Sequence, residues 1–351
     1  MKKLIFVIAT ALISVISFSQ DDFERLIREG IDLHDRGYYE EAIKKYDSVL
    51  EKNKNHYLAN YEKSYTLLML NKFDESIAIS KLLIAVDPGN ENTKSVYVNW
   101  GTAFDDKGDR DAALKIYDIG IKAYPDFYLL HFNKAVTLML QKQYEESLQS
   151  FQQALTCNPM HGSSHQFIGR ILLNSNRIPA FMSFFTFLLL ESQSDRAKQN
   201  YSYMNDLIMK GIKDNPDGRG TTINIEAAML DKKNKNKEND FSSIDMMLSL
   251  TSALDKDEKF KGQNEAERLG RKIQLLADMF KEQKKSGKGF YWSFYAPFFI
   301  DLKENDRLLT ACYLSCINAG SDTVNKWLKE NDKKVNEFYS WLKDYKWTGQ
   351  K

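Results

Sequence analysis

The sequence predicts an all-α protein in which an array of helical hairpins precedes a second helical domain. Three observations predict this architecture. Small, aromatic and turn-forming residues recur at a nearly fixed interval over about half of the chain, prolines end most of the repeated units, and apolar residues keep helical spacing both within the repeats and after them. Because 351 residues are more than one hydrophobic core usually covers, two domains are expected.

The first twenty residues, MKKLIFVIATALISVISFSQ, have the layout of a secretory signal peptide. Two lysines precede an apolar run from Leu4 to Ile16, and the small residues Ser17 and Ser19 follow it. The run is shorter than a membrane-spanning helix. We therefore expect residues 1–20 to be cleaved and the mature protein to be secreted across the inner membrane into the periplasm. An uncleaved N-terminal anchor is the alternative.

Charge and apolar content exclude several classes of partner. The chain has 49 Lys and Arg against 48 Asp and Glu, so it exerts no general attraction on nucleic acid, and no nucleic-acid partner is expected. The longest later apolar run, Phe181 to Leu190, is about half the length of a membrane span and predicts a buried helix rather than a stable span. Three cysteines are too few for a disulfide framework and are expected to be small buried side chains.

Four units repeat in register. Their turn positions are Gly37, Asn71, Gly108 and Lys142, which are separated by 34, 37 and 34 residues. The longer interval contains Gly89 to Thr93, where extra residues lengthen a loop. Two later positions of each unit hold a small and then a mostly aromatic residue: Ala42 and Tyr46, Ser76 and Ser80, Ala113 and Tyr117, Ser147 and Phe151. Pro88, Pro125 and Pro159 close three units, and Lys54 stands at the end of the first.

Each unit is predicted to form two antiparallel helices. A small residue such as Gly101 or Ala113 lets the two backbones approach, while Phe104 and Tyr117 fill the remaining space. The Gly or Asn at the turn tolerates a positive φ angle, and the closing proline ends the second helix. A single unit cannot bury its apolar face, so the units must stack on one another.

This pattern resembles the tetratricopeptide repeat family, whose motif combines Trp, Leu-Gly, Tyr, Ala, Phe and Pro. The third unit matches best, with Trp100, Gly101, Gly108, Ala113, Tyr117 and Pro125. The resemblance covers about residues 23–192, as four clear units and a degenerate fifth at 162–192. It implies a right-handed solenoid of helical hairpins over residues 21–193, followed by a helical C-terminal domain, residues 194–351, of no recognised family.

The resemblance also implies a binding surface, because the first helices of such hairpins line a concave wall that receives a peptide or helix of a partner. The candidate protein-binding groove consists of Ile27, Ile31, Tyr61, Tyr65, Leu68, Val98, Phe132, Val136 and Met139. Relatives that clamp a C-terminal carboxylate need polar side chains where Ile27 and Ile31 stand. An apolar helix or extended segment of a protein is therefore the expected partner. Packing of this wall against the chain's own C-terminal half is the alternative.

The C-terminal half keeps helical spacing without the repeat. Leu309, Cys312, Tyr313 and Cys316 form an apolar stripe that Gly320 ends. Two polar segments, Lys213–Thr222 and Asp231–Asp240, predict loops.

The densest feature of this half is GFYWSFYAPFFI, Gly289 to Ile300. It predicts a core segment with Pro297 near a helix start. A ligand-binding patch and a membrane-surface patch are the alternatives.

No catalytic, cofactor-binding or metal-binding residue is predicted, and no cofactor. Gly218–Thr222 lacks the lysine of a phosphate-binding loop. His161 and His165 have a spacing that suits a metal, yet His161 closely follows Pro159 and no third ligand is evident. The function expected is that of a non-enzymatic scaffold or adaptor for protein–protein interaction. The alternative is an enzyme or small-ligand receptor with its site around Trp292 and Tyr295, in which the repeats serve for recruitment. The sequence leaves the oligomeric state open.

Overall fold

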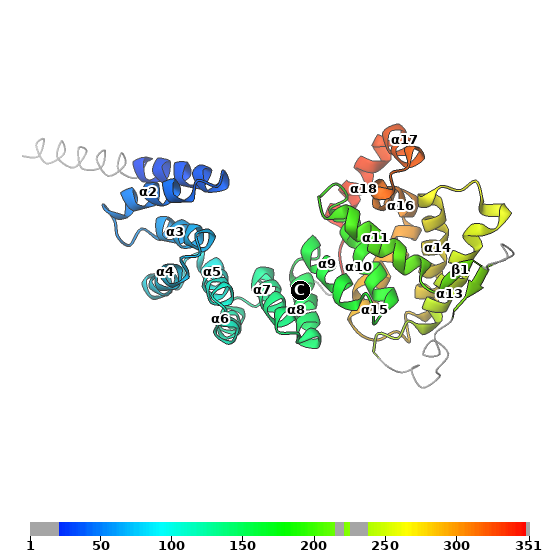
Figure 1. Ribbon diagram of the computed structural model, residues 1–351, viewed down its shortest axis with the longest axis horizontal. Coiled ribbons are helices and arrows are strands. Elements are labelled where there is room, and N and C mark those ends of the chain that lie inside the picture. Colours follow the sequence, from blue (N-terminus) through cyan, green and yellow to red (C-terminus); the bar gives the residue numbers. More distant parts are fainter. Residues whose placement is uncertain (1–20, 215–220, 225–237, 349–351) are drawn as a thin grey trace, which may run out of the picture. The chain divides into compact units, whose positions relative to one another are not determined.

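The computed structural model describes residues 21–214, 221–224 and 238–348 of the chain, and this part is almost entirely α-helical, as predicted (Figure 1). The chain divides into two compact units, one ending at Ser150 and the other beginning at Phe151. The expected signal peptide, residues 1–20, lies outside the described residues, as do residues 231–237 of the second predicted loop. No helix among the described residues has the length and apolar content needed to cross a membrane.

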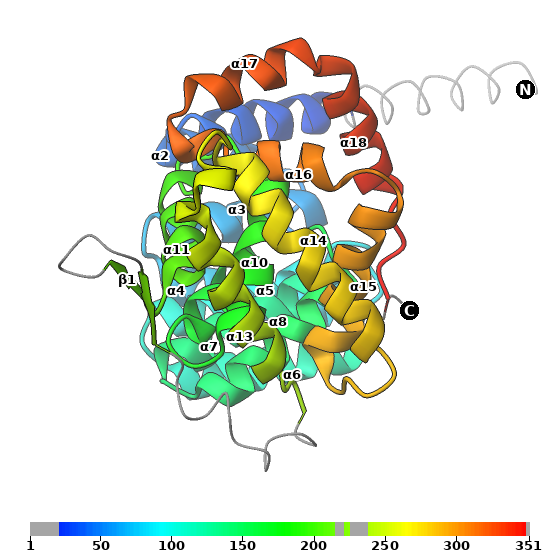
Figure 2. The ribbon, with the colours of Figure 1, turned by 90° about the vertical axis from the view of Figure 1, so that its right-hand side faces the viewer.

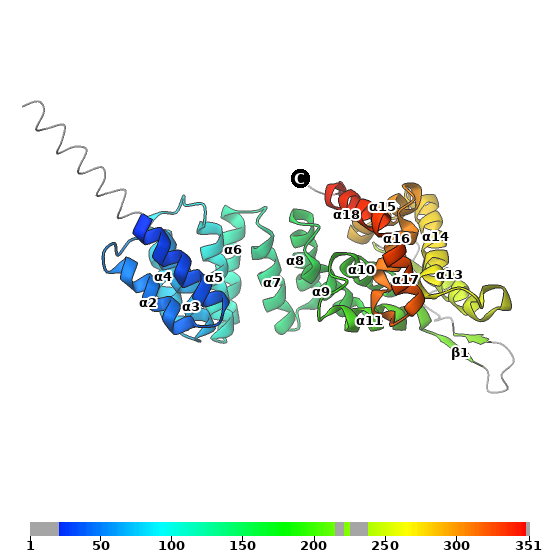
Figure 3. The same cartoon turned by 90° about the horizontal axis from the view of Figure 1, so that it is seen from above.

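The first unit is a series of helical hairpins (Figure 3). Residues 21–35 are helical, and the helices that follow are α2 (Tyr39–Leu50), α3 (Tyr57–Met69), α4 (Phe73–Val86), α5 (Thr93–Asp106), α6 (Arg110–Ala123), α7 (Tyr128–Leu140) and α8 (Tyr144–Cys157), within which the division between the units falls. From α2 to α7 each helix packs against the next in the chain. The hairpin array predicted from the repeat is therefore confirmed.

The turns inside the first four hairpins have the predicted left-handed backbone. The φ angle is 83° at Gly37, 56° at Asn71, 94° at Gly108 and 63° at Lys142. A glycine adopts this conformation freely, whereas a lysine carries a Cβ that disfavours it. The fourth unit therefore keeps the same turn with a residue poorly suited to it.

The two helices of a hairpin touch through small residues in two different ways. In the third unit a Cβ atom on Gly101 would lie 2.2 Å from Cε1 of Tyr117, so only glycine fits beside that ring. In the second unit the hydroxyl of Ser76 donates to the carbonyl oxygen of Ser64 at 2.9 Å instead. Ser147 donates to the carbonyl of Ala135 in the same way, at 2.8 Å.

Polar side chains connect each hairpin to the loop before it. The side-chain amide of Asn60 donates to the carbonyl of Lys54 at 2.9 Å. Nε2 of His131 lies 2.7 Å from the carbonyl oxygen of Pro125, so this nitrogen carries the proton. In both cases the acceptor lies six residues earlier and ends the preceding unit.

The second unit is also helical. Its elements are α9 (Gly162–Leu172), α10 (Arg177–Leu190), α11 (Ala197–Met209), β1 (Ile212–Asp214), β2 (Thr221–Ile223), α13 (Ser242–Ala253), η2 (Leu254–Lys256), η3 (Glu258–Phe260), α14 (Glu265–Gln283), α15 (Phe290–Glu304), α16 (Leu308–Ser315), η4 (Ile317–Ala319), α17 (Asp322–Glu330) and α18 (Asp332–Asp344). The apolar run at Phe181–Leu190 belongs to α10, which is buried from Arg177 to Leu189.

The position of α10 accounts for the boundary between the units. It forms a hairpin with α9, as the degenerate fifth repeat predicts, and it also packs against α11, α13, α15 and α16. Because these contacts lie in the C-terminal half, the fifth hairpin groups with the second unit, which begins at Phe151. The end of the repeat array expected at residue 193 stays a prediction.

Two local predictions in the second unit need correction. The ends of the predicted loop Lys213–Thr222 pair as antiparallel strands, with Ile212 opposite Ile223 and Asp214 opposite Thr221. Pro297 lies inside α15 instead of near its start. The proline leaves the carbonyl of Ser293 without its helical donor, and the hydroxyl of Thr348 donates to that carbonyl.

The aromatic segment forms the core of the second unit. α15 runs beside α14 (Figure 2), and Tyr291, Trp292, Phe294 and Tyr295 are all buried. The ring of Trp292 stacks on that of Phe241 with centroids 4.5 Å apart. The core interpretation of this segment is therefore confirmed.

Candidate functional site

In the first unit, the first helices of three successive hairpins, α3, α5 and α7, form a continuous surface. α5 packs against both α3 and α7, so the outward strips of the three helices adjoin. The hydroxyl of Thr137 donates to Oδ2 of Asp105 at 2.8 Å and joins the strips of α7 and α5. The surface, called the wall below, consists of Leu58, Tyr61, Glu62, Tyr65 and Met69 on α3, of Ser95, Val98, Thr102, Asp105 and Asp106 on α5, and of Leu129, Phe132, Val136, Met139 and Leu140 on α7.

Four of the apolar side chains of the wall are substantially exposed to water. The exposed fraction is 36% for Leu58, 40% for Tyr65, 41% for Met69 and 48% for Leu140. Leu58, Tyr65 and Met69 follow one another at helical spacing along α3. An exposed apolar strip of this kind marks a surface that gains free energy when another molecule covers it.

The structure places seven of the nine predicted groove residues at or near this surface. Tyr65 is exposed, and Ile31, Tyr61, Val98, Phe132, Val136 and Met139 are half-buried. Ile31 and Val98 also pack against core clusters of their hairpins. The two others, Ile27 and Leu68, are only 2% and 4% exposed and belong to core clusters themselves, Leu68 together with Ile77 and Ala103, so they offer little surface to a partner.

Met69 and Leu140 were missed by the sequence analysis. Each directly follows a residue assigned to the groove, Leu68 or Met139. The signal was the helical spacing from Tyr65, because residue 69 is one turn further along the same face. The outward face of α3 is therefore displaced by one residue from the predicted one.

Tyr65 is held in place by the preceding hairpin. Its ring stacks on the imidazole of His34 with centroids 4.9 Å apart. Nδ1 of His34 lies 2.8 Å from the hydroxyl oxygen of Thr66, and burial lowers the pKa of the imidazole. A neutral, hydrogen-bonded ring thus orients an exposed tyrosine, which reduces the entropy lost when a partner binds.

The wall also carries carboxylates that lack strong cationic partners. Burial, reinforced by the nearby Asp35, raises the pKa of Glu62 to about 6. Burial, reinforced by the adjacent Asp105, raises the pKa of Asp106. Asp105 itself lies 3.4 Å from Nε of Arg110 on α6. The raised pKa values show that the wall disfavours negative charge on these groups.

The rings of Trp292 and Tyr295, around which the alternative site was expected, lie in the core of the second unit. Both rings are buried, and neither lines the two pockets described below for the second unit. The burial of these rings also leaves little of their surface to contact a membrane.

The hydroxyl of Tyr295 takes part in a buried hydrogen-bond chain. Nε2 of His165 donates to the carbonyl of Pro159 at 2.8 Å, so Nδ1 accepts from Tyr295 at 2.7 Å. Burial lowers the pKa of His165 to about 3. His161 contacts Ser164 instead, so the two histidines do not converge. Within the described ranges, no three His, Cys, Asp or Glu side chains are grouped to hold a metal ion.

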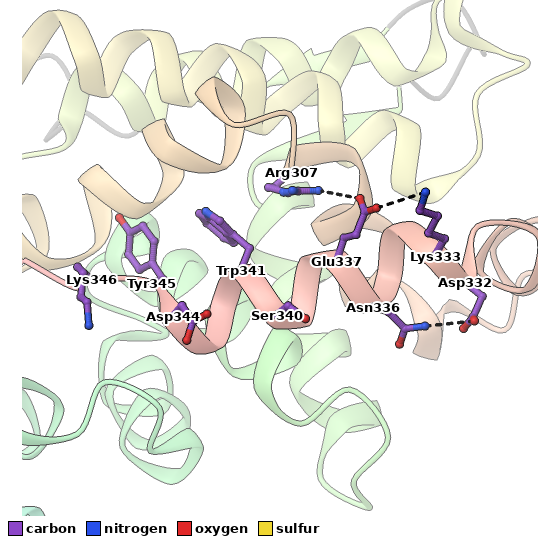
Figure 4. Close-up of a pocket in the computed structure, with 10 residues that line it drawn as sticks. All are labelled: Arg307, Asp332, Lys333, Asn336, Glu337, Ser340, Trp341, Asp344, Tyr345 and Lys346. Carbon is purple, nitrogen blue, oxygen red and sulfur yellow. Dashed lines mark hydrogen bonds and ion pairs between the residues drawn. The ribbon is translucent and has the colours of Figure 1, made fainter.

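Two pockets in the second unit remain to be considered. One, of about 280 Å³, lies between α11 and α14 and is lined by Tyr201, Asp255, Arg268 and Lys272 among others. Its buried Lys272 is already paired with Asp255. The other, of about 850 Å³, lies along α18 (Figure 4). There Glu337 lies between Arg307, at 3.5 Å, and Lys333, at 4.0 Å, so the charges are mutually compensated.

The comparison with known families finds a match in the N-terminal half. The family model described as tetratricopeptide repeat matches residues 27–91 and 98–160. No curated protein matches the chain.

Several solved structures resemble about half of the chain. A thermophilic TPR protein of Thermus thermophilus is 17% identical, with a TM-score of 0.43, over 53% of this chain and 99% of its own. PilF of Pseudomonas aeruginosa is 15% identical, with a TM-score of 0.44, over 55% of this chain and 91% of its own. MamA of Desulfovibrio magneticus is 16% identical, with a TM-score of 0.39, over 50% of this chain and 98% of its own.

Proposed function

Because residues 27–91 and 98–160 are tetratricopeptide repeats, we propose that this chain is a scaffold whose wall binds a segment of a partner protein. Such repeats mediate protein–protein interaction and are typical of scaffolds rather than of enzymes. All residues of the wall except Ser95 lie within these two matched ranges, which supports the wall as the binding surface.

The observation that carries the proposal is the exposed apolar strip of α3. Leu58, Tyr65 and Met69 lie on one face, are about two-fifths exposed and belong to a helix that packs against α5. Covering apolar area contributes about 25 cal/mol per Å². A partner that places an apolar segment against this strip gains that free energy without any change in the fold of the hairpins.

The proposed location is the periplasm. It is supported by residues 1–20, whose two lysines, short apolar run and small residues are typical of a cleaved secretory signal. The N-terminal sequence of the protein recovered from the cell envelope tests this location, since a chain that retains Met1 contradicts cleavage.

The binding proposal is tested by a pair of double variants. Tyr65→Ser with Met69→Ser removes the apolar strip of α3, whereas Leu82→Ser with Val86→Ser removes two comparably exposed apolar side chains from the second helix of the same hairpin. Partner capture from cell-envelope extract is then compared between the two variants and the wild type. We expect the first variant alone to lose specific partners, with circular dichroism unchanged in both.

Equal capture by the wild type and the α3 variant would remove the assignment of the wall. Loss of the same partners from both variants would place binding on the apolar surface in general instead of on the wall.

A further inference from the structure

The lysines of the wall helices all point away from the wall. α3, α5 and α7 contain one lysine each and no arginine. Nζ of Lys63 lies 2.6 Å from Asp47 on α2, and Nζ of Lys134 lies 2.6 Å from Asp118 on α6. Nζ of Lys94 lies over the ring of Phe127, 5.2 Å from its centroid. Each lysine of these three helices thus has a partner away from the wall: an aspartate of α2, an aspartate of α6 or the ring of Phe127.

The acidic residues of the same three helices lie on the wall. They are Glu62 on α3 and Asp105 and Asp106 on α5, and α7 has none. Within the described part of the chain, only Asp105 has a cation nearby, which is Arg110 at a long 3.4 Å. On the preceding helix, residues 21–35, Arg28 pairs with Glu24 at 3.5 Å and not with a carboxylate of the wall. Among the described residues, the wall therefore combines apolar side chains with two carboxylates, Glu62 and Asp106, that have no ion-pair partner, and with a third, Asp105, that has a distant one.

Covering this surface with a purely apolar segment would bury the carboxylates further. An ionised carboxylate that loses water without gaining a partner is strongly disfavoured, or it must take up a proton. An acidic segment would add like-charge repulsion to that cost. A segment that carries Lys or Arg between apolar residues removes the penalty while keeping the apolar contacts.

We propose that the occupant of the wall is a cationic apolar segment, with apolar side chains on the strips of α3 and α7 and a Lys or Arg on the carboxylates of α5. This inference rests on the proposed function and specifies its partner. It turns the apolar helix or strand expected from the sequence into one with basic residues at the centre of its contact surface.

Three synthetic peptides test the inference on the full chain. They share their leucine positions and carry Lys, Gln or Glu at the positions between, and fluorescence anisotropy measures their binding at low and at high salt. We expect the Lys peptide to bind at least about tenfold more tightly than the Gln peptide at low salt, with the preference much reduced at high salt. We expect the Glu peptide to bind most weakly.

Two charge reversals locate the effect. Asp106→Lys on the wall is expected to weaken the Lys peptide about tenfold and to strengthen the Glu peptide. Glu75→Lys, at the exposed start of α4, makes the same change in net charge away from the wall and should leave both affinities within about twofold.

Other outcomes separate this inference from the proposed function. Equal affinities for the three peptides, all lost in the Tyr65→Ser and Met69→Ser variant, would retain the wall as the binding surface and overturn its preference for cations. A Lys preference that Asp106→Lys leaves unchanged would place the cation site elsewhere and also overturn the inference. Failure of all three peptides to bind would mean that the C-terminal half or a second copy covers the wall, which contradicts both proposals.

Discussion

Gly101 lies so close to Tyr117 that a Cβ atom on the glycine would be 2.2 Å from Cε1 of the ring. Gly101→Ala must therefore displace the tyrosine, and we expect a net loss of about 1–3 kcal/mol of unfolding free energy. Gly270→Ala in α14 is the matched control, since its nearest atom outside the helix backbone would be 3.8 Å away. That variant should gain about 0.5–1 kcal/mol from helix propensity. Urea unfolding followed by circular dichroism measures both, and a stabilised Gly101→Ala would contradict the packing described for this hairpin.

The turn at Lys142 stores conformational strain. Its φ angle of 63° is the one that glycine supplies at the corresponding positions 37 and 108. We expect Lys142→Gly to raise the unfolding free energy by about 1 kcal/mol, because the Cβ penalty disappears. Gln143→Gly, one residue later and outside the left-handed region, should give no gain. A loss of stability in Lys142→Gly, measured by the shift in thermal midpoint, would show that the turn is not strained.

Stability should fall in mild acid because of the buried histidines. The pKa of His165 is lowered to about 3 and that of His161 to about 4, from an ordinary value near 6.5. Below pH 6.5 the unfolded chain therefore binds protons that the folded chain excludes. For His165 alone this linkage costs about 2 kcal/mol at pH 5 relative to pH 7.

Two carboxyl groups with raised pKa values, Glu62 and Asp106, oppose this loss. The pKa of Glu62 is raised to about 6, so its protonation favours the folded state as pH falls from 6 towards the ordinary carboxyl range. The shift is smaller than those of the two histidines, and the net effect remains destabilising. Urea unfolding at pH 7 and pH 5 checks this balance. We expect His165→Gln to be less stable at pH 7 and to show a flatter pH dependence, whereas a profile parallel to that of the wild type would refute the role of His165.

Arg177 ties three helices of the second unit together. Its guanidinium donates to the carbonyls of Leu207 and Ile208 at the end of α11, and to Asp245 and Ser249 on α13. Because a lysine cannot reproduce this fork, we expect Arg177→Lys to cost about 3 kcal/mol of unfolding free energy. Arg25→Lys alters an exposed pair and should leave the unfolding free energy nearly unchanged. Equal midpoints in chemical denaturation would contradict the structural role of Arg177.

The hairpins could be predicted because their determinants are local. Gly37, Asn71 and Gly108 indicate the turn conformation, and Pro88 and Pro125 indicate the end of each unit. Lys142 could be placed only through the repeat, since nothing about a lysine favours a positive φ angle. The repeat period predicted the turn at this position, which the residue type alone did not.

The wall was predicted less well than the hairpins. Which side of α3 faces water depends on how α3 packs against α4 and α5, and this rotates the exposed strip from Leu68 to Met69. Helical spacing predicts that α3 has an apolar stripe but locates the centre of that stripe only to within one residue.

In the second unit, contacts between residues far apart in the sequence determine features that local sequence signals do not predict. Pro297 signals a helix start, yet the donor missing at Ser293 is replaced by Thr348, which lies 55 residues further along the chain than Ser293. The buried ion pair of Arg177 with Asp245 likewise joins residues with no shared pattern in the sequence. A family resemblance for this half was absent, so no template supplied these pairings.

The order of the three wall helices determines the spacing between the anchor residues of a segment that binds there. Packed helices lie about 8–10 Å apart, so the apolar strips of α3 and α7 are separated by roughly 16–20 Å, with the carboxylates of α5 between them. An extended chain advances about 3.3 Å per residue. A strand that crosses the three helices therefore reaches both apolar strips with anchors about five or six residues apart and a basic residue midway, whereas an α-helix needs anchors about three turns apart. Candidate partner sequences can be searched for either of these two anchor spacings.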